Sequence, residues 1–338
     1  MVPKAELHVH LEGTATPDLV RRLAERNGLP VPEGLLAEPI GARPAEPGAS
    51  AQPERFAYDG FLDFLRAYDL AASVIRTADD YRDVTYEYLS RCAAEGAIYV
   101  ELIVSPDHAA LVGLPDEEHL NGIARGIDDA RSEHGIEARI LITAIRNLGV
   151  QKATRAARHA ADRTHPYVVG FQMSGDEENF PADTFAEPFE IAADAGLGCS
   201  VHAGEWAGPE SVRAALTLPV TRIGHGVRSS EDPALVDELA ERGIVLECCP
   251  TSNVVLGLYP SYEEHPIREL RAAGVRVTLG SDDPPWFGAS IGGEYAICAE
   301  RLGFSDADLK GLTRTAVEAA FCEEKLKTSL INGLGQWV

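Results

Sequence analysis

Two histidines separated by one residue stand near the beginning of the chain. His8 and His10 lie in the stretch AELHVHLEGT, residues 5–14, within an otherwise apolar run. The alternation favours a half-buried strand, in which residues two apart share a face. A single histidine on such a face is commonly a hydrogen-bonded core residue. Two together raise the alternative of a metal site, and the His-x-His spacing alone does not decide between the two readings.

Further histidines and acids follow other short apolar runs. His202 lies in SVHAGEW, His225 lies in RIGHG, and Asp282 and Asp283 lie in LGSDDPPW. Imidazole and carboxylate groups are the ligands expected of a catalytic zinc site. These side chains form one site only if the fold brings the ends of their runs together, so the pattern of secondary structure decides the question.

The chain alternates between strand-like and helix-like stretches. Between most of the strand-like runs lie amphipathic, alanine-rich stretches that open near proline and close on glycine, as helices do. The expected strands are 5–9, 98–105, 138–145, 168–173, 198–203, 221–226, 244–250 and 275–282. Eight such strands predict a parallel (β/α)8 TIM barrel. A doubly wound open sheet is the alternative, but it usually has fewer strands, and no glycine-rich phosphate loop follows the first run.

A barrel of this kind gathers the polar residues at one rim. Active sites of such barrels lie at the carboxyl ends of the strands. The largest insertion, between the first two strands, holds an expected helix over 17–28, a Pro/Ala/Gly-rich loop over 38–55 and an aromatic helix over 58–75. We expect it to rise over that rim, because long loops in compact domains are often functional. The tail after Asp306 predicts one or two closing helices, and residues 1–338 read as a single domain.

The rim residues predict a mononuclear metal centre. Three imidazoles and a carboxylate with an open position form a catalytic zinc site, and the expected ligands are His8, His10, His202 and Asp282. Barrels with two metals often bridge them with a lysine on the fourth strand, and VVGFQM contains none. A metal-bound water has a pKa lowered towards about 7, which provides a nucleophile at neutral pH.

Two more residues have the chemistry to move protons at this rim. Glu205, three residues after His202, could act as an acid if burial raises its pKa. The alternative is an acid in the first turn of a following helix. His225 could orient or deprotonate the attacking water, or it could be a structural histidine in a glycine-flanked turn.

Composition limits the partners and the location. The 338 residues are 45% hydrophobic and carry a formal net charge of −23, which disfavours nucleic acid as a partner. The six cysteines form no C-x-x-C pair, so free buried thiols are expected rather than disulfides. No segment reaches the roughly 18 apolar residues of a membrane span. The first strand begins near Ala5, which leaves no room for a signal peptide. We expect a cytoplasmic protein that acts on a small molecule.

Several motifs together resemble the adenosine deaminase family. AELHVHLEG, SVHAGE, RIGHG, CPTSN and SDDP stand in the order and spacing of that family, from residue 3 to about residue 300. The resemblance implies a (β/α)8 barrel with one zinc ion. It also implies a hydrolase of purine metabolism, an aminohydrolase that replaces the 6-amino group of a 6-aminopurine with oxygen and releases ammonia. The separate zinc deaminases that act on flipped bases use a P-C-x-x-C signature, which this chain lacks.

The resemblance also implies roles for single residues. His8, His10, His202 and Asp282 are similar to the zinc ligands, Glu205 to the acid that protonates ring nitrogen N1, and His225 to the group that orients the attacking water. The groups that resemble substrate contacts are Asp283 as the acceptor at N7, Gly175 as the backbone donor to N3, and Phe64 and Tyr68 as apolar lid positions.

One position departs from the nucleoside-specific enzymes of that family. They carry aspartate after "HL", where it contacts the ribose 5′-hydroxyl, and this chain has Glu12. HLEGT and SDDPPWFG look more like bacterial branches that include adenine deaminases and aminodeoxyfutalosine deaminases. The expected substrate is therefore adenosine or a related nucleoside, with adenine or aminodeoxyfutalosine as the alternative.

Two readings outside this activity stay open. A different mononuclear-metal hydrolase would cleave an amide or ester with the same ligands but would not need Asp283 or Gly175. A purine-binding barrel without activity ranks last, because every catalytic position holds a competent residue. Assembly into a homo-oligomer is compatible with the sequence.

Overall fold

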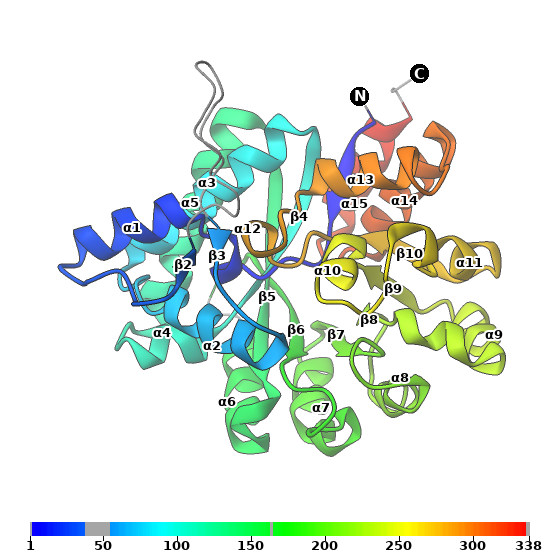
Figure 1. Ribbon diagram of the computed structural model, residues 1–338, viewed down its shortest axis with the longest axis horizontal. Helices are drawn as coiled ribbons and strands as arrows, with labels where there is room; N and C mark the ends of the chain where they lie inside the picture. The colour runs from blue at the N-terminus through cyan, green and yellow to red at the C-terminus, as the bar shows by residue number, and fades with distance from the viewer. Residues whose placement is uncertain (1, 38–54, 163–164, 336–338) are drawn as a thin grey trace.

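Eight parallel strands and a surrounding layer of helices form the molecule. The computed structural model describes residues 2–37, 55–162 and 165–335. The strands pair in the order β1-β4-β5-β6-β7-β8-β9-β10, and helices surround them on the outside (Figure 1). Their bounds are β1 Lys4–Glu6, β4 Ala97–Val104, β5 Glu137–Ile145, β6 Val168–Ser174, β7 Gly198–Ala203, β8 Arg222–His225, β9 Val245–Cys248 and β10 Arg276–Leu279. The (β/α)8 barrel predicted from the alternating runs is confirmed.

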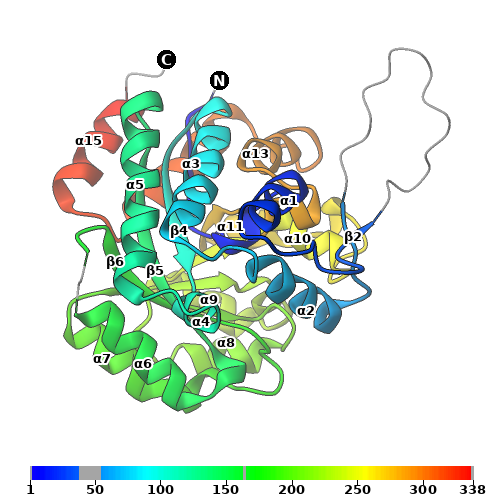
Figure 2. The same ribbon diagram turned by 90° about the vertical axis from the view of Figure 1, so that its left-hand side faces the viewer.

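The helices follow the strands in the expected alternation. Figure 2 shows α3 and α5 side by side along one flank, with α6 and α7 below them. The α-helices are α1 Pro17–Arg26, α2 Phe61–Ala72, α3 Ala78–Ala94, α4 Pro106–Leu111, α5 Asp116–His134, α6 Val150–Ala161, α7 Ala186–Asp194, α8 Pro209–Ala215, α9 Pro233–Arg242, α10 Pro250–Val255, α11 Ile267–Ala272, α12 Pro284–Phe287, α13 Ile291–Glu300, α14 Asp306–Ala319 and α15 Glu324–Leu334. The short 3-10 turns are η1 Glu12–Thr14, η2 Arg146–Leu148, η3 Ala182–Phe185, η4 Val227–Glu231 and η5 Tyr262–Glu264.

Local chemistry explains where several helices begin and end. Thr77 and Asp80 form a capping box at the start of α3. The side chain of Thr77 accepts the backbone N–H of Asp80, and the side chain of Asp80 accepts the backbone N–H of Thr77. Asp232 caps α9, which starts at Pro233, and Gly243 follows its last residue in the left-handed conformation. Such capping, proline and glycine residues can be recognised in the sequence, and they explain why the predicted helices lie within a few residues of the observed ones.

The barrel closes between its first and last strands through residues of the candidate site. The regular part of β1 stops at Glu6, which is shorter than the predicted strand 5–9. Beyond it, Val9 bridges Asp282 and His10 bridges Ile103. The amide of His10 donates to Asp282 O at 3.0 Å, and the amide of Asp282 donates to His8 O at 3.2 Å. The seam of the barrel is therefore fixed at the backbone of the expected ligands.

The long insertion after the first strand contributes a helix and part of a hairpin over the barrel mouth. Helix α2 lies within the predicted aromatic segment, and a two-stranded antiparallel ladder, β2 (Leu36–Ala37) with β3 (Arg55–Phe56), precedes it. Of the Pro/Ala/Gly-rich loop predicted over 38–55, residues 38–54 lie outside the described part of the chain.

The opposite end of the molecule carries the tail. Helices α14 and α15 confirm the closing helices expected after Asp306, and α14 packs beside β1 and β10. A small apolar cluster joins Ala5 and Leu7 to Val317 and Ala320. Burial of these side chains closes the amino-terminal end of the barrel and leaves the other end open.

Two predictions about the whole chain can be compared with the described residues. All six cysteines are free and buried, as expected from their apolar surroundings. Among the described residues, no helix combines the length and the apolar character that crossing a bilayer requires.

Candidate active site

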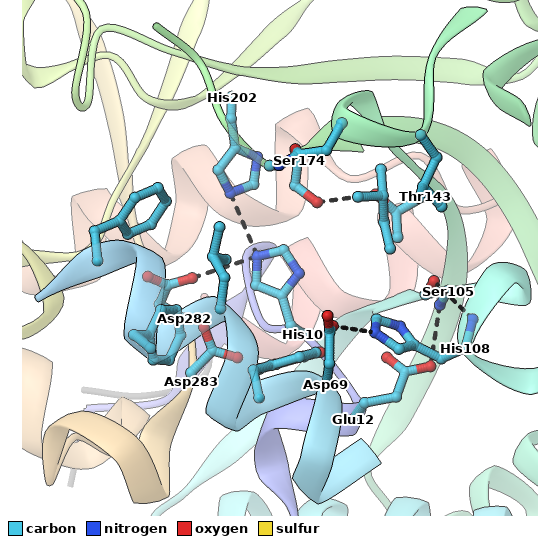
Figure 3. Close-up of a pocket in the computed structure, with 18 of the residues that line it drawn as sticks. His10, Glu12, Asp69, Ser105, His108, Thr143, Ser174, His202, Asp282 and Asp283 are labelled. Carbon is cyan, nitrogen blue, oxygen red and sulfur yellow. Dashed lines mark hydrogen bonds and ion pairs between the residues drawn. The ribbon is translucent and has the colours of Figure 1, made fainter. Parts of the chain in front are cut away.

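A pocket opens at the carboxyl ends of the strands, where the predicted rim residues converge. Of the site residues proposed from the sequence, all except His8 line it, and His8 lies buried directly behind. Figure 3 shows His10, His202, Asp282 and Asp283 on one side and Glu12, Asp69, Ser105 and His108 on the other. The lining residues are His10, Glu12, Phe61, Phe64, Leu65, Tyr68, Asp69, Ser105, His108, Leu111, Thr143, Ile145, Asn147, Leu148, Ser174, Gly175, His202, Glu205, His225, Leu256, Asp282 and Asp283.

The expected metal ligands point their polar atoms at one another. Asp282 Oδ1 lies 3.5 Å from His8 Nε2 and 3.4 Å from His10 Nε2. His10 Nε2 lies 3.3 Å from His202 Nε2. The ligand atoms offered by His8, His202, His225 and Asp282 all lie within 4.8 Å of one another, and His10 forms a second such group with Asp282 and Asp283.

The charge balance of this cluster fits a bound cation. His8 Nδ1 pairs with Glu247 Oε2 at 2.9 Å, which leaves Nε2 to face Asp282, and Nε2 is buried without a hydrogen-bond partner. Burial alone would lower the pKa of His8, but the carboxylates of Asp282, 3.5 Å from Nε2, and of Glu247 raise that pKa to about 10. The pocket therefore favours positive charge at His8 Nε2. A metal ion would supply the same charge after displacing the proton.

Buried partners hold each of these side chains in place. Ser252 Oγ donates to Asp282 Oδ2 at 2.7 Å, and the amide of Gln172 contacts His202 Nδ1. Because a side-chain amide carries both a donor and an acceptor, Gln172 can pair with either tautomer of His202. Such outer partners orient metal ligands and are needed for full affinity.

The partner of His8 belongs to an ion network in the barrel core. Arg222, fully buried, pairs with Glu247 Oε1 at 2.7 Å and with Glu101 Oε2 at 2.6 Å. Its guanidinium carbon lies 3.6 Å from the centroid of the Phe321 ring, below the barrel. Burial would raise the pKa of Glu247, but the charge of Arg222 and the hydrogen bond from His8 lower it. Glu247 therefore stays an acceptor for His8.

Glu205 lies in a loop and not in a helix. It follows β7, and α8 begins only at Pro209, so the alternative of a helix-first-turn acid does not hold. Glu177 clamps this loop by accepting the backbone N–H of Glu205 at 3.1 Å and of Trp206 at 2.9 Å. Burial, together with the nearby charges of Asp282 and Glu177, raises the pKa of Glu205 well above the usual range. A buried carboxyl of this kind holds a proton that it can donate.

His225 ends β8 in an unusual backbone conformation. His225 and Asp282, with φ of 58° and 61°, are the non-glycine residues with positive φ in the described ranges. Residues outside glycine rarely adopt this region, and where they do, the surroundings hold them there. His225 Nε2 lies 3.6 Å from Glu205 Oε2, and burial lowers the pKa of the ring to about 3. The ring is therefore neutral and faces the pocket.

Asp283 and Gly175 flank the pocket where the resemblance places substrate contacts. Asp283 Oδ1 is buried without a hydrogen-bond partner among the described residues. It packs against Gly13, where an added Cβ would lie 1.8 Å from it. Gly175 has φ of +106°, a conformation that a side chain would strain, and its backbone lines the pocket.

A second polar group lies across the pocket from the His/Asp cluster. The carboxylate of Glu12 is buried and accepts the backbone N–H of Ser105 at 3.1 Å. His108 Nε2 lies 2.9 Å from Asp69 Oδ1. Burial raises the pKa of Glu12, although the charge of His108 opposes this. Sequence reasoning singled out Glu12 but missed Asp69 and His108, because they come from two different helices, α2 and α4.

Aromatic side chains cover the mouth. Phe64 and Tyr68 of α2 line the pocket, and their ring centroids lie 6.1 Å apart. Trp286 of α12 packs at 5.4 Å from Phe64 and stacks on Phe56 of the hairpin at 3.8 Å. The insertion therefore provides an apolar wall for a flat ring.

The pocket contains no fixed cation of its own. Within the part of the chain that the structure describes, its lining includes neither lysine nor arginine. Arg146, buried beneath it, donates to the backbone oxygen of His202 at 2.6 Å. A substrate with a phosphate group would find carboxylates and imidazoles here and no basic side chain to pair with it.

The outer partners could in part have been found in the sequence. Gln172 and Glu247 are isolated polar residues in the otherwise apolar runs VVGFQM and IVLECCP. A charged or amide residue in a buried strand requires a partner, and the strand-end histidines are the available ones.

Comparisons with known proteins agree with this geometry. The family model described as adenosine deaminase matches residues 3–337. An adenine deaminase of Chelativorans sp. (strain BNC1) is 45% identical over 331 residues, which cover 98% of this chain and 97% of that protein. The crystal structure of an adenine deaminase from Arthrobacter aurescens has a TM-score of 0.88 at 28% identity and covers 100% of this chain and 99% of that one.

A further solved structure carries a metal. An amidohydrolase from Burkholderia ambifaria with bound Zn has a TM-score of 0.85 at 26% identity, covering 99% of this chain and 90% of that one. The family match spans nearly the whole chain, and the alignments with the two adenine deaminases cover nearly the whole of those proteins. The chain belongs to the adenosine deaminase family and is a hydrolytic aminohydrolase with a site for a single metal ion.

Proposed function

We propose that the chain, as one catalytic domain over residues 1–338, hydrolyses the 6-amino group of free adenine to give hypoxanthine and ammonia. The proposed cofactor is one zinc ion held by His8, His10, His202 and Asp282. The observation that carries the choice of substrate is an apolar-walled pocket with the carboxyl of Glu12 at one side and neither lysine nor arginine in its described lining. Relatives named adenine deaminase support it.

The His/Asp cluster and Glu205 divide the chemistry between them. Bound zinc would polarise a water molecule and lower its pKa, which provides the nucleophile. Glu205, buried and protonated, would donate its proton to ring nitrogen N1 and so make C6 more electrophilic. After attack, the proton of the new C6 hydroxyl would pass to the amino group, which leaves as ammonia while the C6 carbonyl forms. His225, 3.6 Å from Glu205, would orient the attacking oxygen on its way to C6. Asp283 would hydrogen-bond N7, and the backbone N–H of Gly175 would bond N3.

Glu12 distinguishes a free base from a nucleoside in this proposal. Free adenine carries a hydrogen on its imidazole ring, whereas adenosine carries ribose at N9. Glu12 accepts one hydrogen bond, from Ser105, and a carboxyl group has room for another in either protonation state. An N–H of the base would occupy that position. A ribose at N9 would remove that N–H, and the longer side chain of Glu12 would occupy space that the shorter aspartate leaves for the ribose in the nucleoside-specific enzymes.

Adenosine or another nucleoside is the second candidate, and it was the first expectation from the sequence. Thr143, Ser174 and Asn147 line the pocket and could bond ribose hydroxyls. Two of these groups, Thr143 Oγ1 and Asn147 Oδ1, already have partners, however. Thr143 bonds Gln172, and Asn147 Oδ1 accepts the backbone N–H of Asp176 at 2.7 Å. This engagement favours the free base.

Specificity constants decide between the candidates. We expect kcat/KM for adenine to exceed the values for adenosine, 5′-methylthioadenosine and AMP, followed by ultraviolet absorbance and ammonia release. Glu12→Ala should lower kcat/KM for adenine by about 5–150-fold, the equivalent of one lost buried hydrogen bond, and leave adenosine turnover unchanged or raised. Glu118→Ala, an exposed position on α5, is the control. Preference for adenosine, or an equal loss on all substrates, contradicts the proposal.

A further inference from the structure

His225 is connected to a second buried histidine that lies away from the pocket. Asn253, on α10, places its amide Nδ2 3.2 Å from His225 Nδ1. The other end of the same amide, Oδ1, lies 3.1 Å from His265 Nε2. All three side chains are buried, with exposed fractions of 0–3%. His225, Asn253 and His265 therefore form a chain of hydrogen bonds without direct contact with solvent.

A backbone group fixes the direction of this chain. The N–H of Ile267 donates to His265 Nδ1 at 3.3 Å, and a backbone N–H can only donate. His265 Nδ1 therefore carries no hydrogen, and the single proton of the ring is on Nε2. Burial lowers the pKa of His265 to about 3, which agrees with one proton on the ring.

The proton on His265 then determines the orientation of Asn253. Because His265 Nε2–H donates, the atom of Asn253 that faces it must be the amide oxygen. The NH2 group of Asn253 must face His225 and donate to Nδ1. Gln172 differs, because its other partner is the hydroxyl of Thr143, which can donate or accept, so its amide is free to face His202 either way.

We infer that Asn253 and His265 are positioning residues that hold His225 in the tautomer with its proton on Nε2. In this tautomer the nitrogen that faces Glu205 and the pocket is an N–H donor. It has no lone pair for a metal ion, although its position beside His8 and Asp282 would otherwise suit a ligand. It also cannot accept a proton as a first step.

This assignment rests on the proposed function and chooses between the two roles left open for His225. The ring orients the attacking oxygen by donating a hydrogen bond to it and does not deprotonate it. A preorganised donor of this kind holds the attacking oxygen in place for its approach to C6. The assignment also explains why three imidazoles, and not four, are available to the metal.

Nuclear magnetic resonance tests the tautomer without any substrate. In zinc-loaded protein labelled with 15N-histidine, two-bond proton–nitrogen correlations report which ring nitrogen carries hydrogen, and His225→Gln identifies the signal of His225. We expect the Nε2–H form. Asn253→Asp presents a carboxylate oxygen to Nδ1 and should move the proton there. His265→Leu frees the amide of Asn253 to turn and should give both forms.

Kinetics provide the second readout. The Nδ1–H form lacks the donor in the pocket, so Asn253→Asp should lower kcat by about 10²–10³-fold with KM changed little. Asn121→Asp, the same change at an exposed position of α5, should leave both constants and the tautomer unaltered. Circular dichroism checks the fold of each variant.

The outcomes separate this inference from the choice of substrate. A wild-type His225 with hydrogen on Nδ1 overturns it, and so does an Asn253→Asp or His265→Leu variant that keeps the pure Nε2–H form. If adenosine proves to be the better substrate but the tautomers behave as stated, the proposed substrate fails and the positioning role stands.

Discussion

Replacing Glu205 with glutamine removes the acidic proton of the side chain but keeps its size and shape. The side chain of Glu205 is 8% exposed, so a charged or smaller replacement would disturb the packing, whereas glutamine has nearly the same volume. The loop should stay in place, because Glu177 bonds the backbone N–H groups of 205 and 206 and not the side chain. Glu205→Gln therefore tests the acid alone.

The size of the effect follows from what the amide can still do. Glutamine can bond ring nitrogen N1 with its NH2 group, so binding of adenine should be nearly unchanged. It cannot transfer a proton, and loss of a general acid costs about 10²–10⁴-fold in rate. This corresponds to about 3–5 kcal/mol of transition-state stabilisation at about 1.4 kcal/mol for each factor of ten. The loss should appear in kcat and only weakly in KM.

The assay follows adenine by absorbance under steady-state conditions and measures zinc in the same samples. We expect Glu205→Gln to keep its metal and to lose the stated rate. Glu241→Gln, the same change at an exposed position of α9, should behave as the wild type. If Glu205→Gln retains more than about a tenth of the wild-type kcat, the acid is another group and the role assigned to Glu205 is wrong.

Two further changes test the surroundings of the site. Burial lowers the pKa of His119 to about 3, against about 6.5 in the unfolded chain. As the pH falls between these values, the unfolded chain binds a proton and the folded chain does not. The free energy of unfolding therefore drops by up to about 1.4 kcal/mol per pH unit. His119→Leu should reduce this pH dependence of the free energy of unfolding, measured by urea titrations at pH 7 and 5.5. An unchanged pH dependence would show that His119 does not contribute to it. Gly224→Ala would place a Cβ 2.8 Å from His8 Cε1 and should weaken zinc affinity roughly tenfold or more in chelator competition, whereas Gly333→Ala, with open space around it, should not. Equal affinities would show that the site accommodates the methyl group.

The sequence predicted the architecture, and the convergence of the candidate site residues at one rim follows from it, because both depend on local patterns. Alternating runs place the strands, and a parallel barrel requires that His202, His225 and Asp282 share one rim whatever the details of packing. The aromatic helix over the mouth was predicted for the same reason, since Phe64 and Tyr68 recur at helical spacing.

The remaining features depend on contacts between distant segments. Nothing in the sequence pairs His265 with Asn253 or Asp69 with His108, because those pairs form only when separate segments pack on the barrel. The regular first strand was predicted too long, since His8 and His10 are held by the seam with Asp282 and not by a continuous ladder. Burial of Glu12, on which its pKa depends, is likewise a property of the folded pocket.

We have proposed that one zinc ion, held by His8, His10, His202 and Asp282, supports deamination of adenine. To test this, zinc is titrated into protein stripped with a chelator, and the rate of adenine loss is followed at each addition. We expect the rate to rise in proportion to zinc and to reach its plateau at one ion per chain, and we expect His10→Ala to show no such rise. Full activity of the stripped protein, or a plateau only at two ions per chain, would contradict it.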